Sequence, residues 1–214
     1  MLKLKLKKSK YKGKLIVFEG TDGAGKTTLV SLTEKLLKEK YGHDMVVCLK
    51  QPTDLSRKTK LFQKMMYSEN HSDIDYRAVQ LLTMSDRIQH GFEVIEPALR
   101  AGKIVICDRY VYTSLVNMVA REYKKEKWFY EISKHIINPD VKFLAYVDPK
   151  LAIKRIRERP EEANKYLNED LLNRVSALFK KSAYKNNFVI LDTANEPDYV
   201  FVEVVNKLMK ENII

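Results

Sequence analysis

The apolar residues of this chain fall into five short runs, separated by longer stretches in which apolar residues recur every three or four positions. The runs span 15–18, 45–49, 103–107, 141–147 and 188–191, and such lengths are typical of buried strands. The intervening stretches predict amphipathic helices. Because strands and helices alternate, the pattern predicts an α/β fold: a doubly wound, five-stranded parallel sheet flanked by helices.

The longest helical pattern runs from about residue 75 to residue 100 and carries two stripes. We predict that its apolar stripe faces the core; it comprises Leu81, Met84, Ile88, Phe92, Ile95 and Leu99. A polar stripe with the same spacing comprises Gln80, Thr83, Arg87 and His90. Spacing alone favours solvent exposure for the polar stripe. Pro97 is expected to bend or end this helix, and Gly102 to close it.

The first apolar run leads into a glycine-rich loop and then into a predicted helix that ends at Gly42. The loop reads Gly20-Thr21-Asp22-Gly23-Ala24-Gly25-Lys26-Thr27, which matches the strand, GxxxxGK[ST] and helix order of a phosphate-binding loop. Its glycines let backbone N–H groups close around a phosphate chain, and the helix start adds a positive dipole end. The alternative is a chance match in a surface loop, which the flanking strand and helix argue against. We therefore predict triphosphate binding.

Two side chains of this loop have predicted roles of their own. Lys26 is expected to reach the β- and γ-phosphates as a point charge, and the Thr27 hydroxyl is expected to bind Mg²⁺. A second Mg²⁺-handling element is predicted at Asp108, because an acidic residue directly after an apolar strand is typical of proteins with such a loop. The alternative is that Asp108 and Arg109 form an ion pair on the surface.

Three further segments are predicted from their position in the chain. The loop that starts at Lys50 and Pro52 follows the second strand, at the edge where open parallel sheets bind ligands. Residues 192–196 follow the last strand and are the expected location of the adenine contacts. The polar segment from about 157 to 169 lacks a periodic apolar face and is the candidate for a short lid.

Size and charge indicate one domain with a basic leader. The chain has 214 residues, 45% of them apolar, which suits a single domain over 14–214. Its net charge is +11, and the first fourteen residues carry seven lysines. We expect the leader, residues 1–13, to be a solvated, frayed or short edge strand. An arm that binds an anionic surface is the alternative, but no nucleic-acid partner is expected.

The cysteines and the hydropathy pattern indicate a cytoplasmic protein. Cys48 and Cys107 end apolar runs and are expected to be small buried hydrophobes. Neither has the spacing of a zinc site or of a disulfide framework, so a reducing compartment fits. The chain has no run of eighteen apolar residues, and its start is too short and too charged for a secretory signal.

Three segments together resemble the thymidylate kinases, P-loop nucleoside monophosphate kinases that move the γ-phosphoryl group of ATP onto dTMP. These segments are FEGTDGAGKTT, LLTMSDRIQHGFEVIEPALRAGKIVICDRY and NPDVKFLAYVDPKLAIKRIRER. The resemblance runs from about residue 15 to residue 191. It implies ATP and dTMP as small-molecule partners, Mg²⁺ as cofactor, a short lid and a homodimer paired through helices.

Carried over position by position, the resemblance implies roles for individual residues. Gly20 to Thr28 would hold the ATP phosphates, and Asp22 would contact the acceptor's sugar. Arg109 would grip the acceptor phosphate, and Asp108 would help to place Mg²⁺ and the acceptor. The remaining acceptor-binding positions would be Lys50, Pro52, Thr83, Asn117 and Arg87, with Arg87 bonding the thymine edge. On this resemblance the polar stripe that contains Arg87 would be a wall of the substrate site and not a solvent-exposed face. Because Gly23 stands where some family members have an arginine, a lid arginine is expected to act, and the candidates are Arg157 and Arg159.

Some positions depart from the family pattern and leave alternatives open. Thr83 and Asn117 stand where the family commonly has aromatic residues, and Lys50-Gln51-Pro52 replaces Arg-Glu-Pro. Loss of a stacking ring costs about 1–3 kcal/mol of base binding, on the scale of single-stranded nucleic acid. One alternative is therefore a kinase of another or several nucleoside monophosphates. The other is a non-kinase, nucleotide-gated binding module, which has no need for an arginine that holds an acceptor phosphate.

Overall fold

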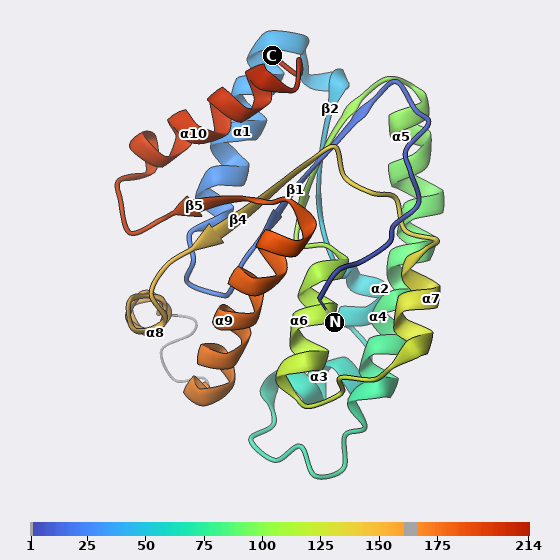
Figure 1. Cartoon of the computed structure of the whole chain (residues 1–214), viewed down its shortest axis with the longest axis vertical. Coiled ribbons are helices and arrows are strands. Elements are labelled where there is room, and N and C mark those ends of the chain that lie inside the picture. Colours follow the sequence, from blue (N-terminus) through green and yellow to red (C-terminus); the bar gives the residue numbers. More distant parts are fainter. Residues whose placement is uncertain (1, 161–166) are drawn as a thin grey trace.

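A computed structural model describes residues 2–160 and 167–214 and confirms the predicted fold class (Figure 1). One five-stranded sheet, in which every pair of neighbouring strands is parallel, has the order β2-β3-β1-β4-β5. The strands are β1 (Lys14–Glu19), β2 (Val46–Lys50), β3 (Ile104–Asp108), β4 (Val141–Tyr146) and β5 (Val189–Asp192).

Helices cover both faces of the sheet, with α1 and α10 on one face and α5, α6 and α9 on the other (Figure 1). The helices of the described part are α1 (Lys26–Tyr41), α2 (Asp54–Arg57), α3 (Lys60–Tyr67), α4 (Tyr76–His90), α5 (Glu96–Arg100), α6 (Val111–Ala120), α7 (Lys127–Ser133), α8 (Pro149–Arg157), α9 (Glu169–Asn186) and α10 (Pro197–Lys210), with a 3-10 turn η1 (His43–Met45) and a π-helical turn η2 (Gly91–Ile95). None of these helices is long and apolar enough to cross a bilayer.

The central strand β1 is buried on both sides, which explains its unbroken apolar run. Leu15 and Val17 pack toward α5 and α6, whereas Ile16 and Phe18 pack toward α1. Alternating side chains of a strand point to opposite faces, so a strand covered on both faces needs apolar residues at every position.

The strand order places the loop after β1 beside the loop after β3, at the carboxyl ends of the strands. β1 pairs with β3 on one side and with β4 on the other, and Phe18 lies opposite Asp108. From β1 the chain continues to β2, which lies on one side of β1, and later reaches β4, which lies on the other side. The carboxyl ends of β1 and β3 therefore lie at a topological switch point. Open α/β sheets bind ligands at such points.

The prediction for the apolar stripe of α4 is wrong at three positions. Leu81, Ile88 and Phe92 are 48%, 38% and 71% exposed. Met84, Ile95 and Leu99 are buried, as predicted.

The polar stripe of α4 is buried instead of solvated, except at half-buried His90. Gln80, Thr83 and Arg87 are buried because α4 packs against α6, where backbone and hydroxyl groups offer partners. Arg87 donates to the carbonyls of Thr83 (3.0 Å) and Tyr110 (3.1 Å). The Thr83 hydroxyl bonds the Gln80 carbonyl at 3.1 Å. Satisfied hydrogen bonds allow polar groups to be buried at little cost.

Pro97 does not end the helical region at its own position. The π-helical turn η2 precedes it, and α5 then starts at Glu96 with proline in its first turn. Proline is tolerated in a first turn because its missing N–H has no helical partner there. The region continues to Arg100, and Gly102 follows with a positive φ of 79°.

The cysteine prediction holds for one of the two residues. Cys107 in β3 is buried, whereas Cys48 is exposed. Cys48 lies in β2, an edge strand with a neighbour on one side only. Both thiols are free.

The predicted solvated or frayed leader is wrong for the part that the structure describes. Leu2 and Leu4 are buried, and the amide side chain of Asn186 in α9 bonds to both backbones. Lys7 bonds to the backbones of Ile136 and Asn138. The leucines alternate with lysines, so the segment directs leucines inward and lysines outward, as an extended strand does.

Truncation of a leader leucine should destabilise the whole protein. Leu4→Ala is expected to lower the free energy of unfolding by about 2–3 kcal/mol, because it removes buried methyl groups and leaves a cavity. Lys5→Ala, one residue along and exposed, is the matched control and should stay within about 0.5 kcal/mol of the parent. Urea unfolding measures both; equal stability of Leu4→Ala and the parent would contradict the packed leader.

Candidate active site

The loop between β1 and α1 has the backbone geometry of a phosphate cradle. Gly20 and Gly23 have φ of 145° and 75°, which residues with a side chain rarely adopt. A Cβ at Gly23 would also lie 2.3 Å from the carbonyl oxygen of Ala152. α1 begins directly after this loop, with no side-chain cap and no acidic residue in its first turn. Its free N–H groups are therefore available to an anion.

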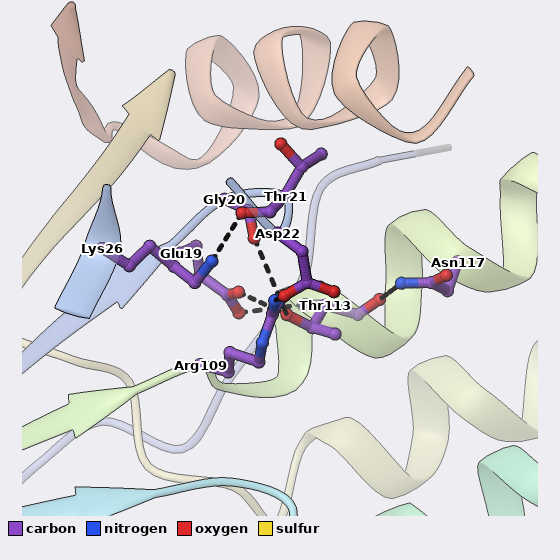
Figure 2. Close-up of polar contacts among 8 residues, drawn as sticks. All are labelled: Glu19, Gly20, Thr21, Asp22, Lys26, Arg109, Thr113 and Asn117. Atoms are coloured by element: carbon purple, nitrogen blue, oxygen red, sulfur yellow. Dashed lines mark hydrogen bonds and ion pairs between the residues drawn. The ribbon is translucent and has the colours of Figure 1, made fainter. Parts of the chain in front are cut away.

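Lys26 is buried at the floor of this loop. Its Nζ donates to the carbonyl oxygen of Thr21 at 2.6 Å (Figure 2). Burial, and then the positive charge of Arg109, lower the pKa of Lys26 from 10.5 to about 7. An anion bound beside Lys26 would raise this pKa again and so favour the charged amine.

A cavity of about 360 Å³ opens beside the loop, on the side of β5. Its walls come from the loop and α1, from α8 and from the segment after β5. The lining residues include Gly23, Thr28, Arg155, Arg159, Thr193 and Glu196. The segment predicted to contact adenine was 192–196, and residues 193–196 of it line this cavity. Thr27 is exposed in the first turn of α1.

Arg109 points toward the phosphate loop and not toward bulk solvent (Figure 2). Its side chain is 14% exposed. Nη1 donates to the carbonyl oxygen of Gly20 at 2.9 Å, and Nη2 donates to Asp22 Oδ1 at 2.5 Å. The alternative of a surface pair between Asp108 and Arg109 is therefore wrong, because the ionic partner is Asp22 of the loop.

The charges of Asp22 and Arg109 stabilise each other. Arg109 holds the pKa of the Asp22 carboxyl well below its ordinary value; burial opposes this shift and Lys26 adds to it. Burial disfavours the charged form of Arg109, but Asp22, Glu19 and Asp108 outweigh burial and its pKa is raised. A fixed guanidinium beside the phosphate loop can bind a second anion.

Asp108 fits a role in cation binding. It is buried, and its Oδ1 has no hydrogen-bond partner within the described residues. No group of three or more His, Cys, Asp or Glu residues in that part of the chain could hold a metal by itself. Mg²⁺ commonly takes one or two carboxylates together with substrate phosphates and water, so this donor set suits it.

A second cavity, of about 170 Å³, brings three predicted acceptor residues together. Asp22, Arg109 and Asn117 line it, opposite the start of α9. The Asn117 amide is already engaged, because Nδ2 donates to the Thr113 carbonyl and Oδ1 accepts from Arg121.

The other predicted acceptor residues are spread over α4 and the loop after β2. Arg87 is buried and its Nε has no partner among the described residues, while Thr83 lies one turn earlier on the same helix. Pro52 is buried at the end of β2, and Lys50 is exposed. The structure does not bring these residues into the cavity that Arg109 lines.

The two predicted lid arginines differ in position. Arg159 lines the larger cavity, whereas Arg157 is exposed at the end of α8 and lines neither of the two cavities. Of the predicted lid, 157–169, residues 161–166 lie outside the described residues. Arg155 was missed; its Nη2 donates to the Thr193 carbonyl at 2.9 Å, between α8 and the segment after β5.

Glu19 is a second residue that sequence reasoning missed. It is 0% exposed and bonds the start of α6 (Figure 2). Burial raises the pKa of Glu19, although Thr113, Arg109 and Tyr110 oppose the shift. The available signal was a charged residue that ends an otherwise apolar strand, directly before the phosphate loop.

Binding of ATP should be coupled to proton uptake by Lys26. At pH 8 this amine is mostly neutral in the free protein, because its pKa is about 7. A triphosphate beside it raises that pKa, so we expect uptake of about one proton per ATP at pH 8 and much less at pH 6. Calorimetric titration in two buffers of different ionisation enthalpy measures this uptake. Lys26→Met should abolish the dependence of the binding heat on the buffer. Equal binding heats of the parent in the two buffers at pH 8 would contradict the lowered pKa of Lys26.

Comparisons with known proteins identify the family of this chain. A family model described as thymidylate kinase matches residues 18–204. A probable thymidylate kinase of Pyrococcus horikoshii is 38% identical over 151 residues, 69% of this chain and 72% of that protein. A thymidylate kinase of a Geobacillus species is 30% identical over 208 residues, 94% and 98% of the two chains. The crystal structure of thymidylate kinase from Ehrlichia chaffeensis superposes with a TM-score of 0.67 at 25% identity, covering 92% and 98%. The chain belongs to the thymidylate kinase family.

Proposed function

We propose that this protein is a nucleoside monophosphate kinase that transfers the γ-phosphoryl group of ATP to dTMP, giving dTDP and ADP. The observation that carries the proposal is the position of Arg109. Its guanidinium comes from the end of β3, yet it bonds the carbonyl of Gly20 in the phosphate loop. The Arg109 guanidinium thus lies beside the loop that would hold the donor triphosphate. We place the acceptor phosphate against the same guanidinium. Membership of the family supports dTMP as the acceptor.

The donor side is built from the phosphate loop and the larger cavity. Backbone N–H groups from Gly20 to Thr28 hold the phosphate chain, with Lys26 on the β- and γ-phosphates. The cavity beside residues 193–196 takes the adenine. Donor phosphates therefore end close to Arg109.

The acceptor side is built around Arg109 and Asp22. Arg109 grips the acceptor phosphate through charge-assisted hydrogen bonds, and Asp22 accepts a hydrogen bond from the sugar. Arg87, whose Nε has no hydrogen-bond partner within the described residues, would bond the base edge. The remaining predicted contacts are Lys50, Pro52, Thr83 and Asn117.

The chemistry requires in-line positioning and neutralisation of charge on the transferred group. Thr27 and Asp108 would hold Mg²⁺, which would neutralise negative charge on the phosphates. Arg159 borders the donor cavity and supplies further positive charge from the lid side, as Arg157 was also predicted to do. By analogy with arginine fingers, loss of the acting arginine lowers the rate on the order of 10³-fold.

Acceptor selectivity depends on the wall beside Arg87. The wall beside Arg87 carries Thr83 in place of a stacking ring, and a hydroxyl gives no comparable contact with a base face. The second candidate function is therefore a kinase of several monophosphates. The cytoplasmic location and the lack of a nucleic-acid partner remain predictions from the sequence.

A coupled assay with ATP and a panel of monophosphates tests the proposal. We expect turnover of dTMP to exceed that of dCMP and dGMP, and Arg109→Ala to lower it about 10³-fold. Arg77→Ala is the matched control, because Arg77 is an exposed arginine at the start of α4, and it should retain parent activity. Equal turnover of the three monophosphates would contradict thymine selectivity. Full activity of Arg109→Ala would contradict the role of Arg109.

We also propose that the protein is a homodimer that pairs through α4 and η2. The exposed apolar residues Leu81, Ile88 and Phe92 are spaced by seven and four positions, so they lie on one helix face. Several exposed apolar residues on one helix face are typical of a protein interface. The family resemblance implies pairing through helices, which this stripe suits.

Light scattering after gel filtration tests the dimer. The parent should have the mass of two chains, and Phe92→Asp should shift it toward one, because a buried unpaired charge opposes association. Val202→Asp, at an exposed apolar position of α10, is the control and should stay dimeric. A parent of monomer mass would refute the interface.

A further inference from the structure

The carboxylate of Glu19 ties the end of β1 to the start of α6 (Figure 2). Oε1 accepts hydrogen bonds from the backbone N–H groups of Tyr110 and Thr113, both at 2.9 Å. Oε2 accepts from the Thr113 hydroxyl at 2.5 Å. Among the described residues Glu19 forms no ion pair, so these donors from one helix start compensate its burial. A carboxylate at a helix N-terminus is also favoured by the helix dipole.

Thr113 connects this carboxylate to Arg109. Its hydroxyl oxygen accepts a hydrogen bond from Arg109 Nη1 at 3.3 Å. A hydroxyl has one proton to donate, and the bond to Glu19 uses it. The lone pairs of Thr113 Oγ1 therefore face the guanidinium, and Glu19 determines that orientation.

The backbone of Arg109 needs the same support. Its φ of 66° is in the left-handed region, which is uncommon for a residue with a long side chain. Such conformations persist when the surrounding structure holds them. The N–H of Arg109 donates to the Phe18 carbonyl at 2.9 Å, and the next N–H, of Tyr110, donates to Glu19. The last two residues of β1, Phe18 and Glu19, thus accept hydrogen bonds from the N–H groups of Arg109 and Tyr110 and hold the backbone turn there.

We propose that Glu19 and Thr113 are positioning residues that orient Arg109 toward the acceptor phosphate. This inference rests on the proposed function and adds to it two residues that act through Arg109 and touch no substrate. Lys26 and the donor cavity lie outside this chain of hydrogen bonds. Arg109 also bonds the Gly20 carbonyl of the phosphate loop, so we expect the pair to affect use of the acceptor strongly and binding of ATP only weakly.

Three variants test the pair. Thr113→Val keeps the shape of the side chain and removes the hydroxyl, whereas Thr113→Ser keeps the hydroxyl. Glu19→Gln keeps the shape but brings an NH₂ donor against the donors of α6. We expect Thr113→Val and Glu19→Gln to raise KM for dTMP about tenfold or more, the usual loss for a hydrogen bond to a charged group.

The remaining readouts separate positioning from a merely structural role. KM for ATP should change less than about twofold in Thr113→Val, and Thr113→Ser should restore KM for dTMP to within about threefold of the parent. Thermal unfolding shows whether each variant is folded. Parallel changes in both KM values, or a Thr113→Ser variant as defective as Thr113→Val, would overturn the proposal.

A measurement without turnover separates this proposal from the kinase assignment. In ¹⁵N-labelled protein, the Nε–H resonance of Arg109, assigned with Arg109→Lys, reports how firmly the guanidinium is held. Its hydrogen exchange should be slow in the parent and in Thr113→Ser, and fast in Thr113→Val. Unchanged exchange in Thr113→Val would overturn the positioning pair even in an active kinase. Absence of activity on any monophosphate would overturn the kinase assignment alone.

Discussion

The parallel pairing of β1 with β3 is the constraint on which the candidate site depends. It sets Phe18 opposite Asp108, and the next residues of both strands leave the sheet at the same edge. Arg109 can therefore bond the carbonyl of Gly20, although the two residues are 89 positions apart in sequence. A shift of this register by one residue would send the Arg109 side chain to the other face of the sheet. Backbone hydrogen bonds inside the sheet thus align groups that lie outside it.

The pKa values of the two central cations shift in opposite directions, because burial outweighs the nearby carboxylates at Lys26 and the carboxylates outweigh burial at Arg109. Lys26 is buried with a carbonyl as its hydrogen-bond partner, and its pKa falls. Arg109 has the Asp22 carboxylate as its partner, and its pKa rises. The charged form of Arg109 is therefore favoured throughout, whereas a bound anion would favour the charged form of Lys26. A site that binds two phosphate groups in close contact benefits from one fixed and one inducible cation.

Local signals were enough to predict the strands, the fold class and the phosphate loop. The phosphate loop is predicted from the spacing of its glycines, and the strands are predicted from unbroken apolar runs. Both signals lie within a few neighbouring residues. The face of α4 could not be predicted in this way, because burial of Thr83 and Arg87 depends in part on hydrogen-bond partners at the start of α6, which are the Tyr110 carbonyl and the Ser114 hydroxyl. Spacing shows which residues share a helix face but cannot show which face has a polar neighbour. Glu19 was missed for the same reason, since its donors lie more than ninety residues away.

The leader changes what counts as the smallest functional unit of this enzyme. The matched family region starts at residue 18, but Asn186 in α9 bonds to the backbones of Leu2 and Leu4. A shortened version that began at the first strand would uncover that amide and strip two leucines from the interior. Shortened versions for crystallisation or engineering should therefore keep the lysine-rich start.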